Sequence, residues 1–185
     1  MEKVYYSVLM LKPDSLRSKV SVKILNEVMK AGFLWEKGTQ KHLTLSLQQA
    51  QLFYPFDKEW MNTIGEKTKA LYLQRGLSLS DIFGSEDEKV IGAVVASWVW
   101  QYITSGQVIG IKIYNQDRSI SIIDALKTFV GATNPAEASP DSIRGKYGAD
   151  SIEEANMGQR ACENLAHRSD SWESAQREAS VLGLI

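Results

Sequence analysis

Four side chains spread along the sequence could together move a phosphoryl group. Lys12 follows the apolar stretch Val4–Leu11. Thr133 and Arg144 bracket a loop rich in proline and small residues, and His167 precedes a helical segment. Cations balance the charge that develops on a transferring phosphoryl group, while a neutral imidazole offers a lone pair that can attack phosphorus. These residue types therefore predict phosphoryl transfer, provided that the fold brings them together.

The two histidines are not equal candidates. His42 stands in an expected strand, where a half-exposed strand position is the simplest interpretation. His167 lies among hydrogen-bonding residues, and a lone histidine in such a place is more often structural or exposed than catalytic. The presence of Lys12, Thr133 and Arg144 shifts the balance toward chemistry. The chain has no G-x-x-x-x-G-K-[ST], no G-x-G-x-x-G and no kinase catalytic loop, which excludes the common ATP-binding folds.

Length and composition are typical of one soluble domain. The chain has 185 residues, of which 44% are hydrophobic and 23% charged, enough to bury a core. A formal net charge of −1 argues against a general nucleic-acid binder, because phosphate contacts usually require a basic excess. The single cysteine, Cys162, and an N-terminus unlike a signal peptide favour a cytoplasmic location. The most apolar run, Val90–Trp100, is too short to cross a membrane.

Residue patterns predict both strands and helices. Strands are expected over Val4–Leu11, Phe33–Leu45 and Gln107–Tyr114, the last followed by a turn at Asn115–Asp117, and Val181–Leu182 could add an edge strand. Helices are expected over Val20–Met29, from a capping box at Ser46 toward Tyr54, over Asp57–Gln74, from a second capping box at Ser85–Glu88 to near Gly106, from Ile122 to Gly131, and from Ser171. Few strands separated by helices indicate an α+β sandwich with helices on one face of a sheet.

Seven short motifs carry a family resemblance. They are Lys12-Pro13-Asp14, Phe53-Tyr54, Thr104-Ser105-Gly106, Gly131-Ala132-Thr133-Asn134-Pro135, Ile143-Arg144-Gly145, Asn164-x-x-His167-x-Ser169-Asp170-Ser171 and Glu173-Ser174-Ala175-x-x-Glu178. Each is weak alone, but in this order they resemble the nucleoside diphosphate kinase family over nearly the whole chain. The resemblance implies a ferredoxin-like α+β sandwich with a four-stranded antiparallel sheet. It also implies a single domain over 1–185, with a helical insertion at about 58–94 and another insertion at about 151–163.

The resemblance also implies a mechanism. The family transfers the γ-phosphoryl group of a nucleoside triphosphate such as ATP to a nucleoside diphosphate, by a ping-pong mechanism through a phosphohistidine. By match, His167 is the nucleophile through its Nδ1 nitrogen, Glu178 orients the imidazole, and Ser169 supports it. Tyr54 matches the tyrosine beside the histidine, and Asn164 the amide that meets the ribose hydroxyls.

Substrate contacts and partners follow from the same match. The implied phosphate contacts are Lys12, Lys127, Thr133 and Arg144. Mg²⁺ is expected to be carried by the nucleotide phosphates, with Asp170 touching a magnesium-bound water. The implied partners are nucleoside di- and triphosphates and other copies of the chain, in a homo-oligomer that is a hexamer by family default. No membrane and no specific nucleic acid is expected as a partner.

Three departures from the family pattern keep a second hypothesis open. Lys127 stands where the family has an arginine, and Arg168 where it has a glycine. The aromatic residue that stacks on the base falls near Val95, so the base packs on aliphatic surface or the insertion supplies Trp60, Trp98 or another ring. The alternative to a working kinase is therefore a nucleotide-binding or scaffold protein on the same fold, with weak or no turnover.

Overall fold

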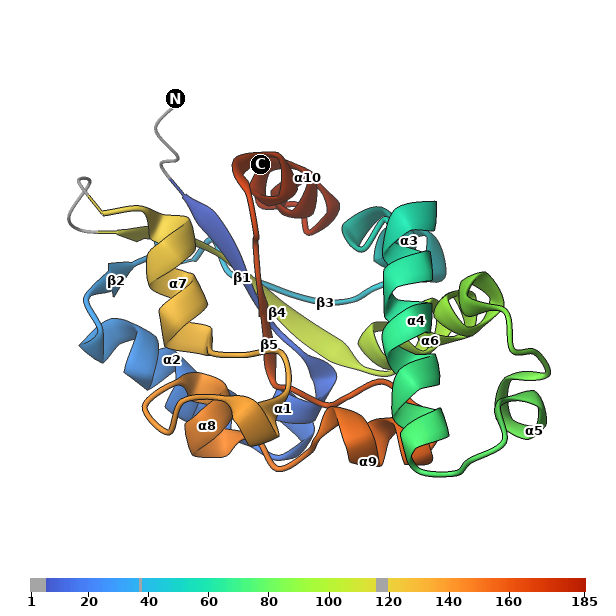
Figure 1. The fold of residues 1–185 in the computed structure, drawn as a ribbon. Coiled ribbons are helices and arrows are strands. Elements are labelled where there is room, and N and C mark those ends of the chain that lie inside the picture. Colours follow the sequence, from blue (N-terminus) through green and yellow to red (C-terminus); the bar gives the residue numbers. More distant parts are fainter. Residues whose placement is uncertain (1–5, 37, 116–119) are drawn as a thin grey trace.

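The site is carried by a five-stranded antiparallel sheet. The computed structural model describes residues 6–36, 38–115 and 120–185. The strands are β1 (Ser7–Leu11), β2 (Phe33–Leu34), β3 (Lys41–Thr44), β4 (Gln107–Asn115) and β5 (Ala166–Arg168). Strand β1 pairs with β4 on one side and β5 on the other, so β5 lies at an edge (Figure 1).

The outer strand opposite β5 is broken in two. We predicted one strand over Phe33–Leu45, but the chain forms β2 and β3 there, and both pair with β4. Strand β2 pairs with Asn115 and Tyr114, and β3 pairs with the segment from Gly110 to Gln107. The prediction of four strands is therefore corrected to five, with two short strands along the same side of β4.

Helices occupy the remainder of the described fold. They are α1 (Pro13–Arg17), α2 (Ser21–Lys30), α3 (Leu47–Phe53), α4 (Lys58–Gln74), α5 (Leu79–Phe83), α6 (Glu88–Thr104), α7 (Ile122–Val130), α8 (Ile143–Tyr147), α9 (Ile152–Met157) and α10 (Trp172–Val181), with a 3₁₀ turn at Pro135–Glu137. No helix within the described ranges is long and apolar enough to span a bilayer.

Hydrophobic cores lie on both faces of the sheet. All five residues of β1 are buried. Because successive side chains point to opposite faces, Val8 and Met10 belong to a core with residues of α3, α6 and α10, whereas Leu9 and Leu11 belong to a core with residues of α2 and α7. The expectation of helices on one face only was wrong, since Figure 1 shows helices on either side of the strands.

Local sequence signals fix most helix starts. The capping box at Ser46 is confirmed, because its hydroxyl accepts from Gln49 N and the Gln49 side chain accepts from Ser46 N. The second predicted box was wrong: Asp87, not Ser85, caps α6 by accepting from Lys89 N at 2.8 Å. The expected edge strand at Val181–Leu182 is instead the end of α10.

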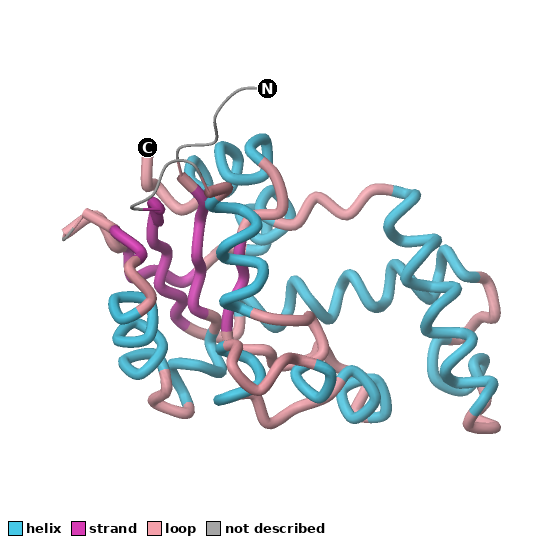
Figure 2. The backbone as a smooth tube through the Cα atoms, turned by 60° about the vertical axis from the view of Figure 1, so that its left-hand side comes forward, coloured by secondary structure: helices cyan, strands magenta, loops and turns pink. Residues whose placement is uncertain are grey.

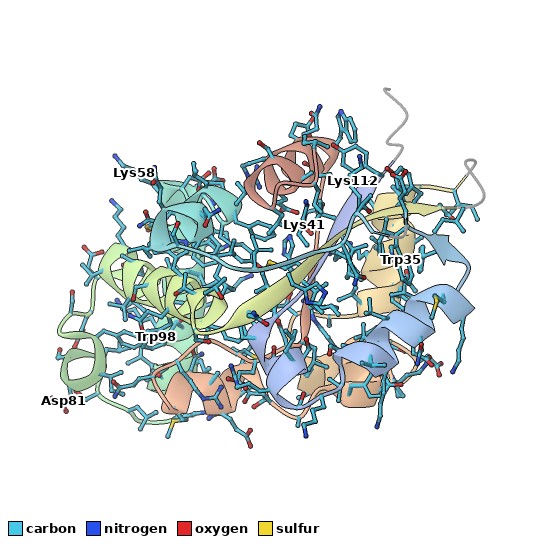
Figure 3. All side chains as sticks on the ribbon, turned by 180° about the vertical axis from the view of Figure 1, so that it is seen from behind. Trp35, Lys41, Lys58, Asp81, Trp98 and Lys112 are labelled. Atoms are coloured by element: carbon cyan, nitrogen blue, oxygen red, sulfur yellow. The ribbon has the colours of Figure 1, made fainter. Side chains whose placement is uncertain are left out.

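The segment predicted as a helical insertion projects to one side of the sheet. Figure 2 shows these helices as an arm, and Figure 3 places Lys58, Asp81 and Trp98 on it, away from Trp35. Helices α4 and α6 cross closely, because a Cβ at Gly65 would lie 1.8 Å from the Glu88 carbonyl oxygen and one at Gly92 would lie 1.8 Å from that of Met61. The polar segment at Ser151–Glu163 contains α9, which the sequence did not predict. The turn expected at Asn115–Asp117 and the start of the strand expected at Val4 extend outside the described residues.

Candidate active site

A pocket of about 470 Å³ opens beside β5. One end is lined by Lys12, Tyr54, Arg144 and His167, and the other continues between the insertion and α9. These residues come from segments far apart in the sequence, and the pairing of β1 with both β4 and β5 brings them together. The phosphoryl-transfer residues of the sequence therefore share one cavity.

His167 is held from one side by a carboxylate. It lies on β5, opposite Met10 of β1, and its side chain is 12% exposed. Its Nε2 atom lies 2.9 Å from Oε2 of Glu178, on α10. Nε2 is buried and makes no well-aligned hydrogen bond among the described residues, so this carboxylate is the acceptor within reach. The arrangement favours a proton on Nε2, which leaves the Nδ1 lone pair free.

Ser169 fixes the carboxylate in turn. Its hydroxyl donates to Oε2 of Glu178 at 2.7 Å and accepts from the backbone N–H of Val8 at 3.1 Å. Both Ser169 and Glu178 are buried. A buried acceptor with two defined partners cannot rotate freely, so strand β1 sets the position of the carboxylate that faces His167.

Aromatic edges confine the imidazole ring. Phe53 and Tyr54, at the end of α3, lie with ring centroids 4.9 and 5.0 Å from that of His167, both in edge contact. Burial and the nearby Glu178 raise the pKa of Tyr54 above its ordinary value, so the phenol stays protonated and can donate. The capped helix α3 thus positions both rings against the histidine.

Lys12 is held by Asn164, which is tied in turn to the backbone at Thr133. Its Nζ donates to Oδ1 of Asn164 at 2.7 Å, and the amide of Asn164 donates to the carbonyl of Thr133 at 2.8 Å. Burial, reinforced by the positive charge of Arg144, lowers the pKa of Lys12 from 10.5 to about 7, against the opposing effect of Asp14. A buried cation with a weakened hold on its proton has a strong electrostatic preference for an anionic ligand.

Arg144 is buried and mostly engaged by the backbone. Its Nε donates to the carbonyl of Asn164 at 3.1 Å, and its terminal nitrogens donate to Gly131 at 2.9 Å and Ala166 at 2.7 Å. Gly131 has φ +91°, and a Cβ there would lie 2.3 Å from the Ser142 hydroxyl, so only glycine fits this close approach. Three of the five guanidinium donors are used, which leaves two for a ligand.

The structure shows where Lys127 and Arg168 lie, the two residues that differ in type from the family pattern. Lys127 is exposed on α7 and does not line the pocket, so the structure does not bring this predicted phosphate residue to the site. Arg168 does not adopt positive φ; it lies in β5 and its guanidinium pairs with Asp170. Because its φ is not positive, the large side chain of Arg168 causes no backbone strain at this position.

Asp14 and Tyr102 also belong to the site, although the sequence analysis did not predict either of them as a site residue. The carboxylate of Asp14 accepts from the Tyr102 hydroxyl and from Leu165 N, the latter at 2.9 Å. The ring of Tyr102 lies 5.3 Å from Lys12 Nζ. Asp14 was visible in the motif with Lys12, but no sequence signal joined Tyr102, 88 residues away, to either.

The wall near Val95 contains both aliphatic and aromatic side chains. Val95 and Val99 line the pocket from α6, together with Phe56 and Trp60. Phe56 and Trp60 stack on each other with centroids 3.7 Å apart, and Phe56 also stacks against Tyr54 at 5.5 Å. Of the tryptophans considered as a base platform, Trp60 reaches the pocket, whereas Trp98 is buried against Phe83.

The carboxylates beside His167 are already paired within the protein. Asp170 lines the pocket, but its carboxylate already pairs with Arg168, and Glu178 is engaged by Ser169. The described residues hold no group of three histidine, cysteine or carboxylate side chains that could bind a metal ion. The donors present therefore fit a cation carried on phosphate oxygens and touched through water.

Known proteins match this chain over most of its length. The model of the family described as nucleoside diphosphate kinase matches residues 91–182. A nucleoside diphosphate kinase of Pyrobaculum aerophilum is 31% identical over 172 residues, which are 93% of this chain and 91% of that relative. One from Archaeoglobus fulgidus is 34% identical over 61% of this chain and 62% of its own.

Solved structures match the fold as well. The crystal structure of an NDP kinase from Pyrobaculum aerophilum has a TM-score of 0.86 at 29% identity, covering 96% of this chain and 94% of that one. A transition state mimic of a nucleoside-diphosphate kinase from Borrelia burgdorferi with bound vanadate and ADP shares the fold, with a TM-score of 0.69 at 18% identity over 95% and 84% of the two chains. With a 31% identical relative aligned over 93% of this chain, and with residues of six of the seven motifs lining one pocket, this chain belongs to the nucleoside diphosphate kinase family.

Proposed function

We propose that this chain is a nucleoside diphosphate kinase that moves a γ-phosphoryl group from a nucleoside triphosphate to a nucleoside diphosphate through His167. The observation that carries the proposal is the contact of His167 Nε2 with Glu178 in a pocket that also contains Lys12 and Arg144. A nucleophile, the group that orients it and the cations that stabilise transferred charge are the parts that phosphoryl transfer requires.

In the first half-reaction, the Nδ1 lone pair of His167 attacks the γ-phosphorus. A nitrogen–phosphorus bond forms, the bond from phosphorus to the β,γ-bridging oxygen breaks, and the diphosphate leaves with that electron pair. Glu178 acts as a positioning residue, because its carboxylate lies 2.9 Å from Nε2 and stabilises the positive charge that grows on the ring. In the second half-reaction, a terminal oxygen of the acceptor diphosphate attacks the same phosphorus and releases neutral imidazole.

Charge on the phosphates is balanced by the buried cations. Lys12, with its lowered pKa, takes up a proton as the polyphosphate arrives, and the two unused donors of Arg144 meet phosphate oxygens. Thr133 lines the same cavity. Mg²⁺, when carried by the nucleotide, supplies further neutralisation of the phosphate charge.

The nucleoside end is placed by the Lys12–Asn164 pair. Both side chains are buried and hydrogen-bonded to each other at 2.7 Å, so a ribose hydroxyl that reaches them meets a donor and an acceptor already in position. In this proposal Asn164 contacts the ribose and Tyr54 donates toward the phosphohistidine.

We also propose that the chain assembles as a homo-oligomer, with a hexamer as the expected size. Exposed apolar side chains support self-association, among them Val22 and Met29 on α2 and Leu34 on β2, which are 65%, 52% and 50% exposed. Multi-angle light scattering should give the mass of a hexamer, and a monomer mass would contradict the assembly.

Steady-state kinetics test the catalytic proposal. With ATP as donor and GDP as acceptor, double-reciprocal plots at several fixed GDP concentrations should be parallel, because the donor product leaves before the acceptor binds. Intersecting lines would exclude the two-step route. Nucleotide binding without turnover would favour the alternative of a binding or scaffold protein on this fold.

A further inference from the structure

The carboxylate of Asp14 is a buried charge that the proposed mechanism does not use. Asp14 lies in the first turn of α1 and is 6% exposed. One of its oxygens accepts from the hydroxyl of Tyr102, near the end of α6, and the other accepts from Leu165 N at 2.9 Å, just before β5. Each oxygen therefore has a defined donor, and the carboxylate is fixed between three segments of the chain.

Tyr102 contacts the site with both parts of its side chain. It is 8% exposed, and its ring lies 5.3 Å from Lys12 Nζ. Burial, together with the charge of Asp14 and the hydrogen bond to it, raises the pKa of Tyr102 well above its ordinary value. The hydroxyl therefore keeps its proton at neutral pH and donates it to the carboxylate. The ring meets the lysine, and the hydroxyl meets the carboxylate that faces that lysine.

Lys12 needs a negative charge nearby, because its other surroundings favour the neutral amine. Burial and the positive charge of Arg144 lower the pKa of Lys12 to about 7, and the negative charge of Asp14 opposes both effects. Without that opposition the pKa would fall further. The side chain would then be neutral at neutral pH when the phosphates of a nucleotide arrive.

Asp14 is the negative group among the titratable side chains that face Lys12. These side chains come from α1, the end of α3, α6, α8 and the segment before β5, and they are Asp14, Tyr54, Tyr102, Arg144 and Cys162. Burial raises the pKa of Cys162 to about 12 and also raises the pKa values of both tyrosines, so these three groups are neutral near pH 7. Of these five groups, Asp14 therefore offsets Arg144.

We propose that Tyr102 is a positioning residue for Lys12, because its hydroxyl holds the Asp14 carboxylate that lets the lysine carry its proton at neutral pH. The place of this contact in catalysis rests on the proposed function. Tyr102→Phe keeps the ring beside the lysine and removes the bond to Asp14. One oxygen of a buried carboxylate then lacks its donor, and a carboxylate that turns away or takes up a proton no longer offsets Arg144.

Calorimetry of ADP binding tests the inference without turnover. Titrations at pH 7 in buffers of different ionisation enthalpy report the protons taken up on binding. Because the pKa of Lys12 is about 7, the unaltered protein should take up about half a proton per bound ADP. In Tyr102→Phe the uptake should rise to nearly one proton, because the pKa of the lysine falls. Asp14→Asn removes the same negative charge and should raise the uptake in the same way.

Tyr72→Phe is the matched control. Tyr72 is 1% exposed, and its hydroxyl donates to the backbone carbonyl of Asn156 rather than to a group beside Lys12. This variant loses a buried hydroxyl bond as well, but should still take up about half a proton at pH 7. In Lys12→Gln, adding Tyr102→Phe should change the uptake no further. An unchanged uptake in Tyr102→Phe, an equal rise in Tyr72→Phe, or a rise that persists in Lys12→Gln would overturn the inference.

The pH dependence of kcat/KM with ATP gives a second readout. It should fall on the alkaline side as Lys12 of the free enzyme loses its proton. In Tyr102→Phe this fall should occur about one pH unit lower. A loss of equal size at every pH would indicate a merely structural role and overturn the inference. If ADP binds with the expected proton uptakes but ATP does not phosphorylate His167, the proposed function fails, while the control of the Lys12 charge by Tyr102 is supported.

Discussion

At the scale of single residues, the site depends on how each charged side chain is held. Lys12 is buried against Asn164 and Tyr102, whereas Lys127 is exposed on α7 outside the pocket. The family pattern predicted phosphate contact for both. The match to the family identifies Lys127 by its position in the sequence, but it does not establish which way that side of α7 faces.

The two lysines should therefore differ when removed. Lys12→Ala should lower kcat about 100-fold or more, because a preorganised cation is lost where charge develops. Lys127→Ala should change kcat/KM by no more than about twofold, since an exposed charge screened by water contributes little. Kinetics of phosphate exchange between ATP and GDP would measure both. A large loss in Lys127→Ala, rescued by Lys127→Arg, would show that this side chain reaches the phosphates after all.

The lowered pKa of Lys12 gives a second residue-scale prediction. Near pH 8, Lys12 in the free protein is mostly neutral, because burial holds its pKa at about 7. A bound polyphosphate raises that pKa, so binding should take up close to one proton at pH 8 and far less at pH 6, where the group is already charged. Calorimetry of ATP binding in buffers of different ionisation enthalpy would report the uptake. Equal proton uptake at both pH values would contradict the assignment to Lys12.

At the scale of helices and strands, local patterns predicted elements well where the determining interactions were local. The box at Ser46 depends on residues three apart and was predicted correctly, as were the helices ending near Gln74 and Gly131. The broken strand over Phe33–Leu45 was not, because its interruption depends on pairing with β4, over 60 residues away. At Ser85 the sequence predicted the cap of the next helix, but Asp87 caps it instead, and the Ser85 hydroxyl accepts from Asp87 N.

The crossing of α4 and α6 is an element-scale feature that a single methyl group should disturb. Gly92→Ala would place Cβ 1.8 Å from the carbonyl oxygen of Met61, where backbone must move. We expect a loss of about 1–3 kcal/mol in the free energy of unfolding, as for other overpacked contacts. Urea denaturation would measure it, with Gly106→Ala as the control, because a Cβ there meets Pro13 only at 3.4 Å. Equal stability of the two variants would show that α4 and α6 separate readily.

At the scale of the whole molecule, the sheet assembles a site that no contiguous segment contains. His167 and Ser169 come from the β5 region, Lys12 from the end of β1 and Glu178 from α10, while Arg144 reaches them from α8. The order of the family motifs along the chain predicted that these residues share one site, because the motifs extend over nearly the whole chain. It did not predict Tyr102, or the pocket end formed by α4 and α9, because those contacts depend on the packing of segments whose sequence matched no motif.

The segment predicted as a helical insertion forms one side of the molecule. Helices α4 to α6 extend to one side of the sheet (Figure 2). The Tyr72 hydroxyl donates to the backbone carbonyl of Asn156, which ties α4 to α9.

The phosphohistidine is the central claim, and intact-protein mass spectrometry after incubation with ATP and Mg²⁺ tests it most directly, beside a His167→Ala control. We predict one acid-labile phosphoryl adduct per chain that disappears when GDP is added and never forms in the control. An adduct that persists in His167→Ala, or none in the unaltered protein while nucleotide still binds, would contradict the assignment of His167 as the nucleophile.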